Sequence, residues 1–131
     1  MARILVVDDE RDVVTLIKFL LEKDGHRVSA AYNGREAMEQ LGIEPKAARA
    51  KGELPELIVL DVMMPEVDGL TLCLRLVKED GFKRIPVLVL TAKGQLRDQF
   101  EAAGNVASYL EKPFDPKTLR DIISHILRPA E

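Results

Sequence analysis

Four short apolar runs, each followed closely by a charged or hydroxyl residue, constrain the fold of this chain most. They cover residues 4–7, 57–60, 87–90 and 108–110, and after them come Asp8 and Asp9, Asp61, Thr91 and Lys112. Uninterrupted apolar runs of this length are typical of parallel strands that are buried on both faces of a sheet. Ligands of such sheets bind at the carboxyl ends of the strands. We therefore expect three carboxylates, one hydroxyl and one ammonium group to share a single crevice.

Between these runs lie longer segments whose apolar residues recur at helical spacing, which indicates helices that pack on the sheet. Two helix starts carry capping signals, Asn33 with Glu36 and Asp115 with Pro116. With a further short strand over residues 28–31, the alternation predicts an α/β fold of five parallel strands and five helices. The apolar stripes of the helices are Val13, Leu16, Ile17 and Leu20; Ala37, Met38 and Leu41; Leu70, Cys73, Leu74 and Val77; Leu96, Phe100 and Ala103; and Leu119, Ile122, Ile123 and Ile126.

Length and charge set the class of protein. The 131 residues fit one domain, and the net charge of −3 gives no reason to expect binding to nucleic acid or to a membrane. The apolar stretch near the start, residues 4–7, is too short for a signal peptide or a membrane span. We therefore expect a single cytoplasmic domain over residues 1–131.

Three carboxylates that converge in one crevice need a cation, because each pair repels by about 4 kcal/mol at about 4 Å and an effective dielectric of about 20. The oxygen ligands of Asp8, Asp9 and Asp61 suit Mg²⁺. A carboxylate can also accept a phosphoryl group when a metal and a lysine neutralise the developing charge. Asp61 is the candidate phosphoryl acceptor because it directly follows the most continuous apolar run. We expect the Thr91 hydroxyl and the Lys112 ammonium to bind phosphoryl oxygens.

Four short motifs stand in a fixed order along the chain: Asp8-Asp9, Asp61-x-x-x-Pro65 with Gly69 beyond, Thr91-Ala92, and Lys112-Pro113-Phe114. In these motifs the chain closely resembles the receiver domain of two-component response regulators, over about residues 4–127. The resemblance implies a flavodoxin-like, doubly wound sheet of strand order 2-1-3-4-5 flanked by five helices. It also implies a cis peptide bond before the proline of the last motif. Its implied function is a Mg²⁺-dependent transfer of a phosphoryl group from a histidine kinase to Asp61, which then switches a protein-binding face.

The resemblance assigns three further groups to this site. The backbone carbonyl of Met63 would join the three carboxylates as a metal ligand. The backbone N–H of Ala92 would join Thr91 and Lys112 in binding the phosphoryl group. Tyr109 matches the aromatic residue that reorients when receiver domains are activated.

The implied partners follow from the same resemblance. The phosphodonor would be a sensor histidine kinase or a phosphotransfer protein. A downstream protein or an output domain would bind the face formed by the fourth helix, the fifth strand and the fifth helix, and a phosphorylation-dependent homodimer could use the same face. Neither nucleic acid nor a membrane is expected as a direct partner. The domain would be no enzyme in the ordinary sense, because it catalyses only its own phosphorylation and dephosphorylation.

Three features depart from the family pattern. The family usually has Gly-Ala shortly before the switch aromatic, whereas Gly104-Asn105-Val106 places the glycine one position early. The segment over residues 42–56, between the second helix and the third strand, is longer than usual by roughly two helical turns, and we interpret it as a solvated insertion. After Arg128 there is no linker, so the chain is either a single-domain receiver or a receiver without its output domain.

A different class of protein uses similar chemistry. A small Mg²⁺-dependent aspartyl-phosphate phosphatase or phosphotransferase of the haloacid-dehalogenase type also combines an aspartyl nucleophile with a threonine and a lysine. That family places its nucleophile in an Asp-x-Asp motif after the first strand. Here Asp61 is followed by Val62 and Met63, which leaves no second carboxylate as a general acid. The receiver domain is therefore the preferred interpretation.

Overall fold

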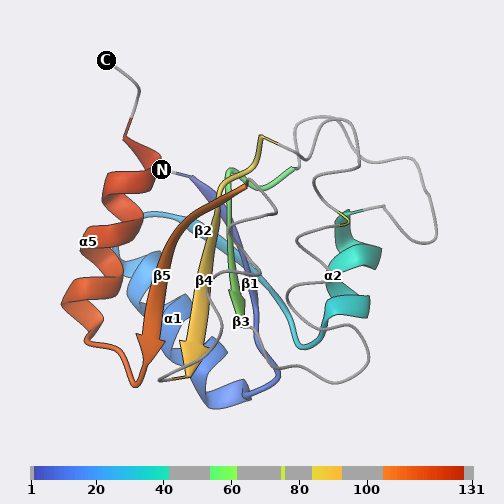
Figure 1. Cartoon of the computed structure of the whole chain (residues 1–131), viewed down its shortest axis with the longest axis horizontal. Coiled ribbons are helices and arrows are strands. Elements are labelled where there is room, and N and C mark those ends of the chain that lie inside the picture. The colour runs from blue at the N-terminus through green and yellow to red at the C-terminus, as the bar shows by residue number, and fades with distance from the viewer. Residues whose placement is uncertain (1, 42–53, 62–74, 76–83, 93–104, 129–131) are drawn as a thin grey trace.

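A five-stranded parallel sheet forms the centre of the computed structural model, which describes residues 2–41, 54–61, 75, 84–92 and 105–128 (Figure 1). Its strands are β1 (Arg3–Val7), β2 (Arg27–Ala31), β3 (Leu57–Asp61), β4 (Val87–Ala92) and β5 (Val106–Lys112). They are ordered β2-β1-β3-β4-β5, as the family resemblance implied. The described helices are α1 (Arg11–Lys23), α2 (Gly34–Leu41) and α5 (Pro116–Leu127). The third and fourth predicted stripes, and residues 42–53 of the predicted insertion, lie outside the described residues.

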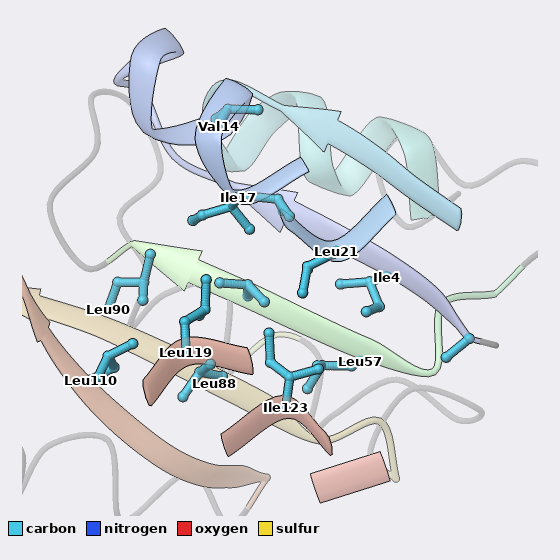
Figure 2. Packing of buried hydrophobic residues seen from close by; sticks show 13 residues of the cluster. Ile4, Val14, Ile17, Leu21, Leu57, Leu88, Leu90, Leu110, Leu119 and Ile123 are labelled. Carbon is cyan, nitrogen blue, oxygen red and sulfur yellow. The ribbon is translucent and has the colours of Figure 1, made fainter. Parts of the chain in front are cut away.

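The helices cover both faces of the sheet, which is why the inner strands β1, β3 and β4 are buried along almost their whole length. Helices α1 and α5 lie on one face and α2 lies on the other (Figure 1). On the first face, Ile17 of α1 and Leu119 and Ile123 of α5 point toward strand residues such as Leu88, as Figure 2 shows. On the second face, Met38 of α2 packs with alternate residues of the same strands. We call these two clusters the α1/α5 core and the α2 core.

Both predicted helix starts are confirmed. At α2 the backbone N–H of Glu36 donates to Asn33 Oδ1 at 2.8 Å, and the Glu36 carboxylate accepts from the N–H of Tyr32 at 2.9 Å. At α5 the N–H of Thr118 donates to Asp115 Oδ2 at 3.0 Å. Each cap satisfies N–H groups that have no partner within the helix. None of the helices in the described part of the chain is long and apolar enough to cross a membrane.

The apolar stripe of α1 differs from the prediction. Its buried residues are Val14, Ile17 and Leu21, whereas Leu16 is 43% exposed and Phe19 is 62% exposed. Each residue turns the helix by about 100°, so Leu16 lies about 100° from Ile17 and outside the arc that meets the sheet. The interpretation of Leu16 as a core residue is therefore wrong. The sequence offered several overlapping apolar arcs, and packing against the sheet selected one of them.

A β-bulge at the start of β5 decides which way the later residues of this strand face. Val87 of β4 pairs with Val106, but the next β4 residue, Leu88, pairs with Ser108, which leaves Ala107 as an extra residue. Val106 and Tyr109 are an odd number of positions apart, yet both pack against the α2 core. In a regular strand they would point to opposite faces. The bulge therefore places Tyr109 on the α2 side of the sheet.

Asn105 directly precedes this bulge and is buried. Its backbone carbonyl accepts from the N–H of Val87 at 2.9 Å. Within the described part of the structure, neither Nδ2 nor Oδ1 of its amide has a hydrogen-bond partner. A buried amide without partners lowers stability. The sequence departure at residues 104–106 thus introduces a polar group into the packed end of the sheet, while Gly104 itself lies outside the described residues.

Candidate functional site

The site is formed where neighbouring strands end. Asp8 directly follows β1 and Asp61 is the last residue of β3, which lies between β1 and β4 in the sheet. Both carboxylates are buried, while Asp9 is exposed. Carboxylate oxygens of Asp8, Asp9 and Asp61 all lie within 4.8 Å of one another. The convergence that the sequence predicted is therefore present.

Lys112, the last residue of β5, carries the positive charge of the site. Its Nζ lies 2.8 Å from Asp8 Oδ2 and 3.3 Å from Asp61 Oδ1. It also lies 3.1 Å from Glu10 Oε1. The peptide bond between Lys112 and Pro113 is cis, as the resemblance implied. One ammonium group thus contacts three carboxylates that come from two strand ends and the start of α1.

Burial and mutual repulsion shift the pKa values of these groups. Burial, together with the negative charge of Asp8, raises the pKa of Asp61 to about 6, although Lys112 acts in the opposite direction. The pKa of Asp8 is also raised by burial, and its hydrogen bond with Lys112 partly offsets this. Burial lowers the pKa of Lys112, but its hydrogen bond to Asp8 and the charges of Asp61 and Asp8 outweigh burial and raise it. A lysine with a raised pKa is fully charged at neutral pH.

The donor set fits a hard divalent cation. Mg²⁺ prefers oxygen ligands and is usually held by one or two carboxylates with water and phosphate oxygens in the remaining positions. Three carboxylate oxygens within 4.8 Å of one another can supply such ligands. Within the described part of the chain, Lys112 is the only cationic side chain in contact with Asp8 and Asp61, so a metal cation would relieve the remaining repulsion. Met63, the fourth ligand that the resemblance implied, lies outside the described residues.

The residues predicted to bind and sense a phosphoryl group lie on β4 and β5. Thr91 is buried near the end of β4, opposite Glu111 of β5. The next residue, Ala92, pairs with Lys112, so its backbone lies beside the lysine. Tyr109 is opposite Val89 and half-buried against the α2 core. Since Thr91 and Val89 are two positions apart in one strand, Thr91 and Tyr109 face the same side of the sheet.

Three contacts at the β1–α1 connection and the first residue of α1 were missed by the sequence reasoning. Glu10 contacts Lys112 through its carboxylate, and its backbone N–H donates to Asp8 Oδ1 at 2.9 Å. The guanidinium of Arg11 lies 4.1 Å from the ring centroid of Tyr32, which follows β2. Glu10 stands directly after Asp8-Asp9, and this position is the sequence feature that could have indicated its contact with the site. A third acidic residue at a helix start is usually a dipole-compensating group, so its contact with a residue 102 positions later was not apparent.

A family comparison matches nearly the whole chain. Residues 4–124 match the model of the response regulator receiver domain. The alkaline phosphatase synthesis transcriptional regulatory protein PhoP of Bacillus subtilis is 38% identical over 130 residues, which are 98% of this chain and 50% of that protein. The protein PilH of Pseudomonas aeruginosa is 34% identical over 97% of this chain and 98% of its own length. The chain thus spans about half the length of PhoP and nearly all of PilH.

Solved structures give the same result. A putative response regulator from Chloroflexus aurantiacus superimposes with a TM-score of 0.82 at 33% identity, covering 96% of this chain and 97% of that one. The chemotaxis response regulator CheY4 of Vibrio cholerae superimposes with a TM-score of 0.82 at 29% identity, covering 97% and 99% of the two chains. The sheet order, the carboxylates at the strand ends and these relatives therefore all indicate a response regulator receiver domain.

Proposed function

The chain belongs to the response regulator receiver domain family, and we propose that Asp61 is its phosphoacceptor. It is thus a receiver domain of two-component signalling. The observation that carries the proposal is the position of Asp61. It is the buried carboxylate at the end of β3, within 4.8 Å of two further carboxylates and 3.3 Å from the Lys112 ammonium. A phosphoryl group on Asp61 would lie among the groups that neutralise its charge.

Phosphoryl transfer needs an ionised and positioned nucleophile. With a pKa of about 6, the Asp61 carboxylate is mostly ionised at neutral pH. One of its oxygens forms a bond to the phosphorus of the donor while the bond from phosphorus to the leaving group breaks. The charged Lys112 compensates the phosphoryl oxygens, and the Thr91 hydroxyl and the Ala92 N–H donate hydrogen bonds to them.

Asp8, Asp9 and Asp61, with the Met63 carbonyl, would hold Mg²⁺. The ion, when bound, supplies positive charge to the phosphoryl oxygens. In its absence, the buried carboxylates would repel an anionic donor. The three carboxylates therefore serve two purposes, since Asp61 is both ligand and nucleophile while Asp8 and Asp9 are ligands alone.

Partners and compartment belong to the same proposal. We expect a sensor histidine kinase or phosphotransfer protein as donor, and a downstream protein or output domain that binds the face near β5 and α5. A phosphorylation-dependent homodimer would form through the same face. The matched RpaA of Synechocystis is a DNA-binding transcriptional regulator, of which this chain spans 51%. For residues 1–131 we expect no direct nucleic-acid contact, because the net charge is −3. We place the domain in the cytoplasm.

PhoP and RpaA are transcriptional regulators and CheY4 is a chemotaxis response regulator, which favours a signalling domain over the phosphatase alternative. We propose that the only reactions it catalyses are its own phosphorylation and dephosphorylation. Incubation with acetyl phosphate and Mg²⁺ should add one phosphoryl group, measured as intact mass. Chelation of Mg²⁺ should reduce the labelling rate by at least about tenfold, because the charge of the carboxylates is then uncompensated. Equal labelling with and without the chelator would contradict the metal site.

We expect the phosphorylated state to be read out through Thr91 and Tyr109. A Thr91 hydroxyl drawn toward a phosphoryl oxygen leaves space on the side of the sheet where Tyr109 lies, and the tyrosine ring can turn into it. We expect Thr91→Ala to accept phosphate at Asp61 but to respond poorly, and Tyr109→Ala to be phosphorylated normally without transmitting the change. The measurement is the amide chemical shifts of residues 105–128 with and without beryllofluoride, a phosphoryl mimic. Shift changes in Thr91→Ala that equal those of the wild type would show that this coupling is wrong.

A further inference from the structure

The ammonium group of Lys112 is shared among more carboxylates than a phosphoryl-binding residue can keep. A lysine has three N–H donors. In this structure Lys112 donates hydrogen bonds to Asp8 Oδ2 at 2.8 Å and to Glu10 Oε1 at 3.1 Å, and Asp61 Oδ1 lies 3.3 Å away. The group that must bind a phosphoryl oxygen is therefore already surrounded. A phosphoryl group on Asp61 must therefore share this ammonium with the carboxylates of Asp8 and Glu10.

The three carboxylates differ in how easily they can give up the lysine. The side chain of Asp8 is 0% exposed, so a loss of Lys112 would leave its buried charge without compensation. Asp61 is 8% exposed, and phosphorylation moves its charge onto the phosphoryl oxygens, so its contact with Lys112 passes to them. The side chain of Glu10 is 61% exposed. Its carboxylate can exchange the ammonium for water at little cost. Glu10 is therefore the ligand of Lys112 that a phosphoryl oxygen displaces most easily.

We propose that Glu10 is a positioning residue that competes with the phosphoryl group for Lys112. This inference rests on the proposed function of Asp61 and adds a control on how tightly the phosphoryl group is held. In the unphosphorylated domain Glu10 holds the ammonium at the mouth of the site. When a phosphoryl oxygen takes that N–H, Glu10 turns into water, while the bond from Lys112 to Asp8 persists. Each binding event thus includes the cost of breaking the contact between Glu10 and Lys112.

The sequence connects Glu10 to the site in a second way. Its backbone N–H donates to Asp8 Oδ1, and its side chain reaches the lysine that is bound to Asp8 Oδ2. The backbone contact does not depend on the side chain. A substitution of Glu10 therefore removes the competing carboxylate and leaves the support of Asp8 in place.

The test is the affinity of beryllofluoride at saturating Mg²⁺, measured by ¹⁹F NMR on the full chain. We expect Glu10→Gln to bind it about three- to fivefold more tightly than the wild type, the factor of one partly exposed ion pair. Asp12→Asn is the matched control, because it removes the same charge two residues away, from an exposed position in the first turn of α1. It should leave the affinity unchanged. A gain in Asp12→Asn that equals the gain in Glu10→Gln would overturn the proposal.

A double-mutant cycle separates competition for the lysine from simple repulsion of the anion. If Glu10 acts through Lys112, its substitution should have no effect on beryllofluoride affinity in a Lys112→Met background. An undiminished gain in that background would identify long-range repulsion and contradict the inference. Unchanged or weaker binding in Glu10→Gln alone would contradict it too. If the wild type binds no beryllofluoride at all, the function proposed for Asp61 fails first, and the two failures are therefore distinguishable.

Discussion

Asp61→Asn is expected to abolish phosphorylation of the domain by acetyl phosphate. The amide keeps the shape of the side chain but is not a nucleophile, and it removes one of the three carboxylates that lie within 4.8 Å of one another. Asp8 is also buried and contacts Lys112, but Asp61 ends β3, the central strand of the sheet, and therefore lies between the ends of β1 and β4. The labelled fraction, measured as intact mass after incubation with Mg²⁺, should fall to background.

Asp121→Asn serves as the control for this experiment. It makes the same chemical change on the exposed side of α5, where Asp121 contacts Lys117 at 2.7 Å. It should be labelled at the wild-type rate. A gain of one phosphoryl group in Asp61→Asn, equal to that of the wild type, would show that another residue is the acceptor, and peptide mapping would then identify it.

Asp61→Asn should also stabilise the folded domain when no metal is present. Burial and the charge of Asp8 raise the pKa of Asp61 from 3.8 to about 6, so the ionised carboxylate is disfavoured in the folded state. At about 1.36 kcal/mol per pKa unit this corresponds to a cost of about 3 kcal/mol near neutral pH. We therefore expect the free energy of unfolding of Asp61→Asn to exceed that of the wild type by about 2–3 kcal/mol at pH 7–8. Denaturation by urea in a metal-free buffer measures it.

The sign of the pH dependence is a separate check. Because the pKa of Asp61 is higher in the folded than in the unfolded state, the folded protein binds this proton more tightly. The cost is therefore fully present above pH 6 and is relieved as the pH falls from about 6 toward 4. The difference between Asp61→Asn and the wild type should shrink over this range. A difference that grows toward acid pH would contradict the pKa of Asp61.

Asp24→Asn provides a control of opposite sign. Its hydrogen bonds with Arg120 lower the pKa of Asp24, so its ionised form stabilises the folded state. This stabilisation is present above the unfolded pKa and is lost as the pH falls through the folded value. Asp24→Asn should therefore be less stable than the wild type at neutral pH, and the difference should diminish in acid. The two aspartates thus distinguish a buried, crowded carboxylate from a paired surface carboxylate.

Local features of the sequence determined the elements of this fold. The apolar runs around residues 4–7, 57–60 and 87–90 became strands because a chain that is apolar on both sides is stable only between two layers. Asn33 and Asp115 marked helix starts because their side chains satisfy N–H groups within three residues. The strand-end positions of Asp8, Asp61 and Lys112 followed from the same pattern. Parallel strands bring their carboxyl ends to one edge.

Tertiary packing decided what depended on the relative placement of these elements. Several residues of α1 could have faced the sheet, and contact with β1, β3 and α5 buried Ile17 and exposed Leu16. The face of Tyr109 depended on the bulge at Ala107, because one extra residue reverses the side of every residue that follows. The pKa of Asp61 and the contact between Glu10 and Lys112 arise from groups on separate segments. The sequence alone thus determined which residues reach the edge of the sheet, whereas only the folded structure decided which of them touch, because short-range contacts and desolvation exist only after distant segments have packed together.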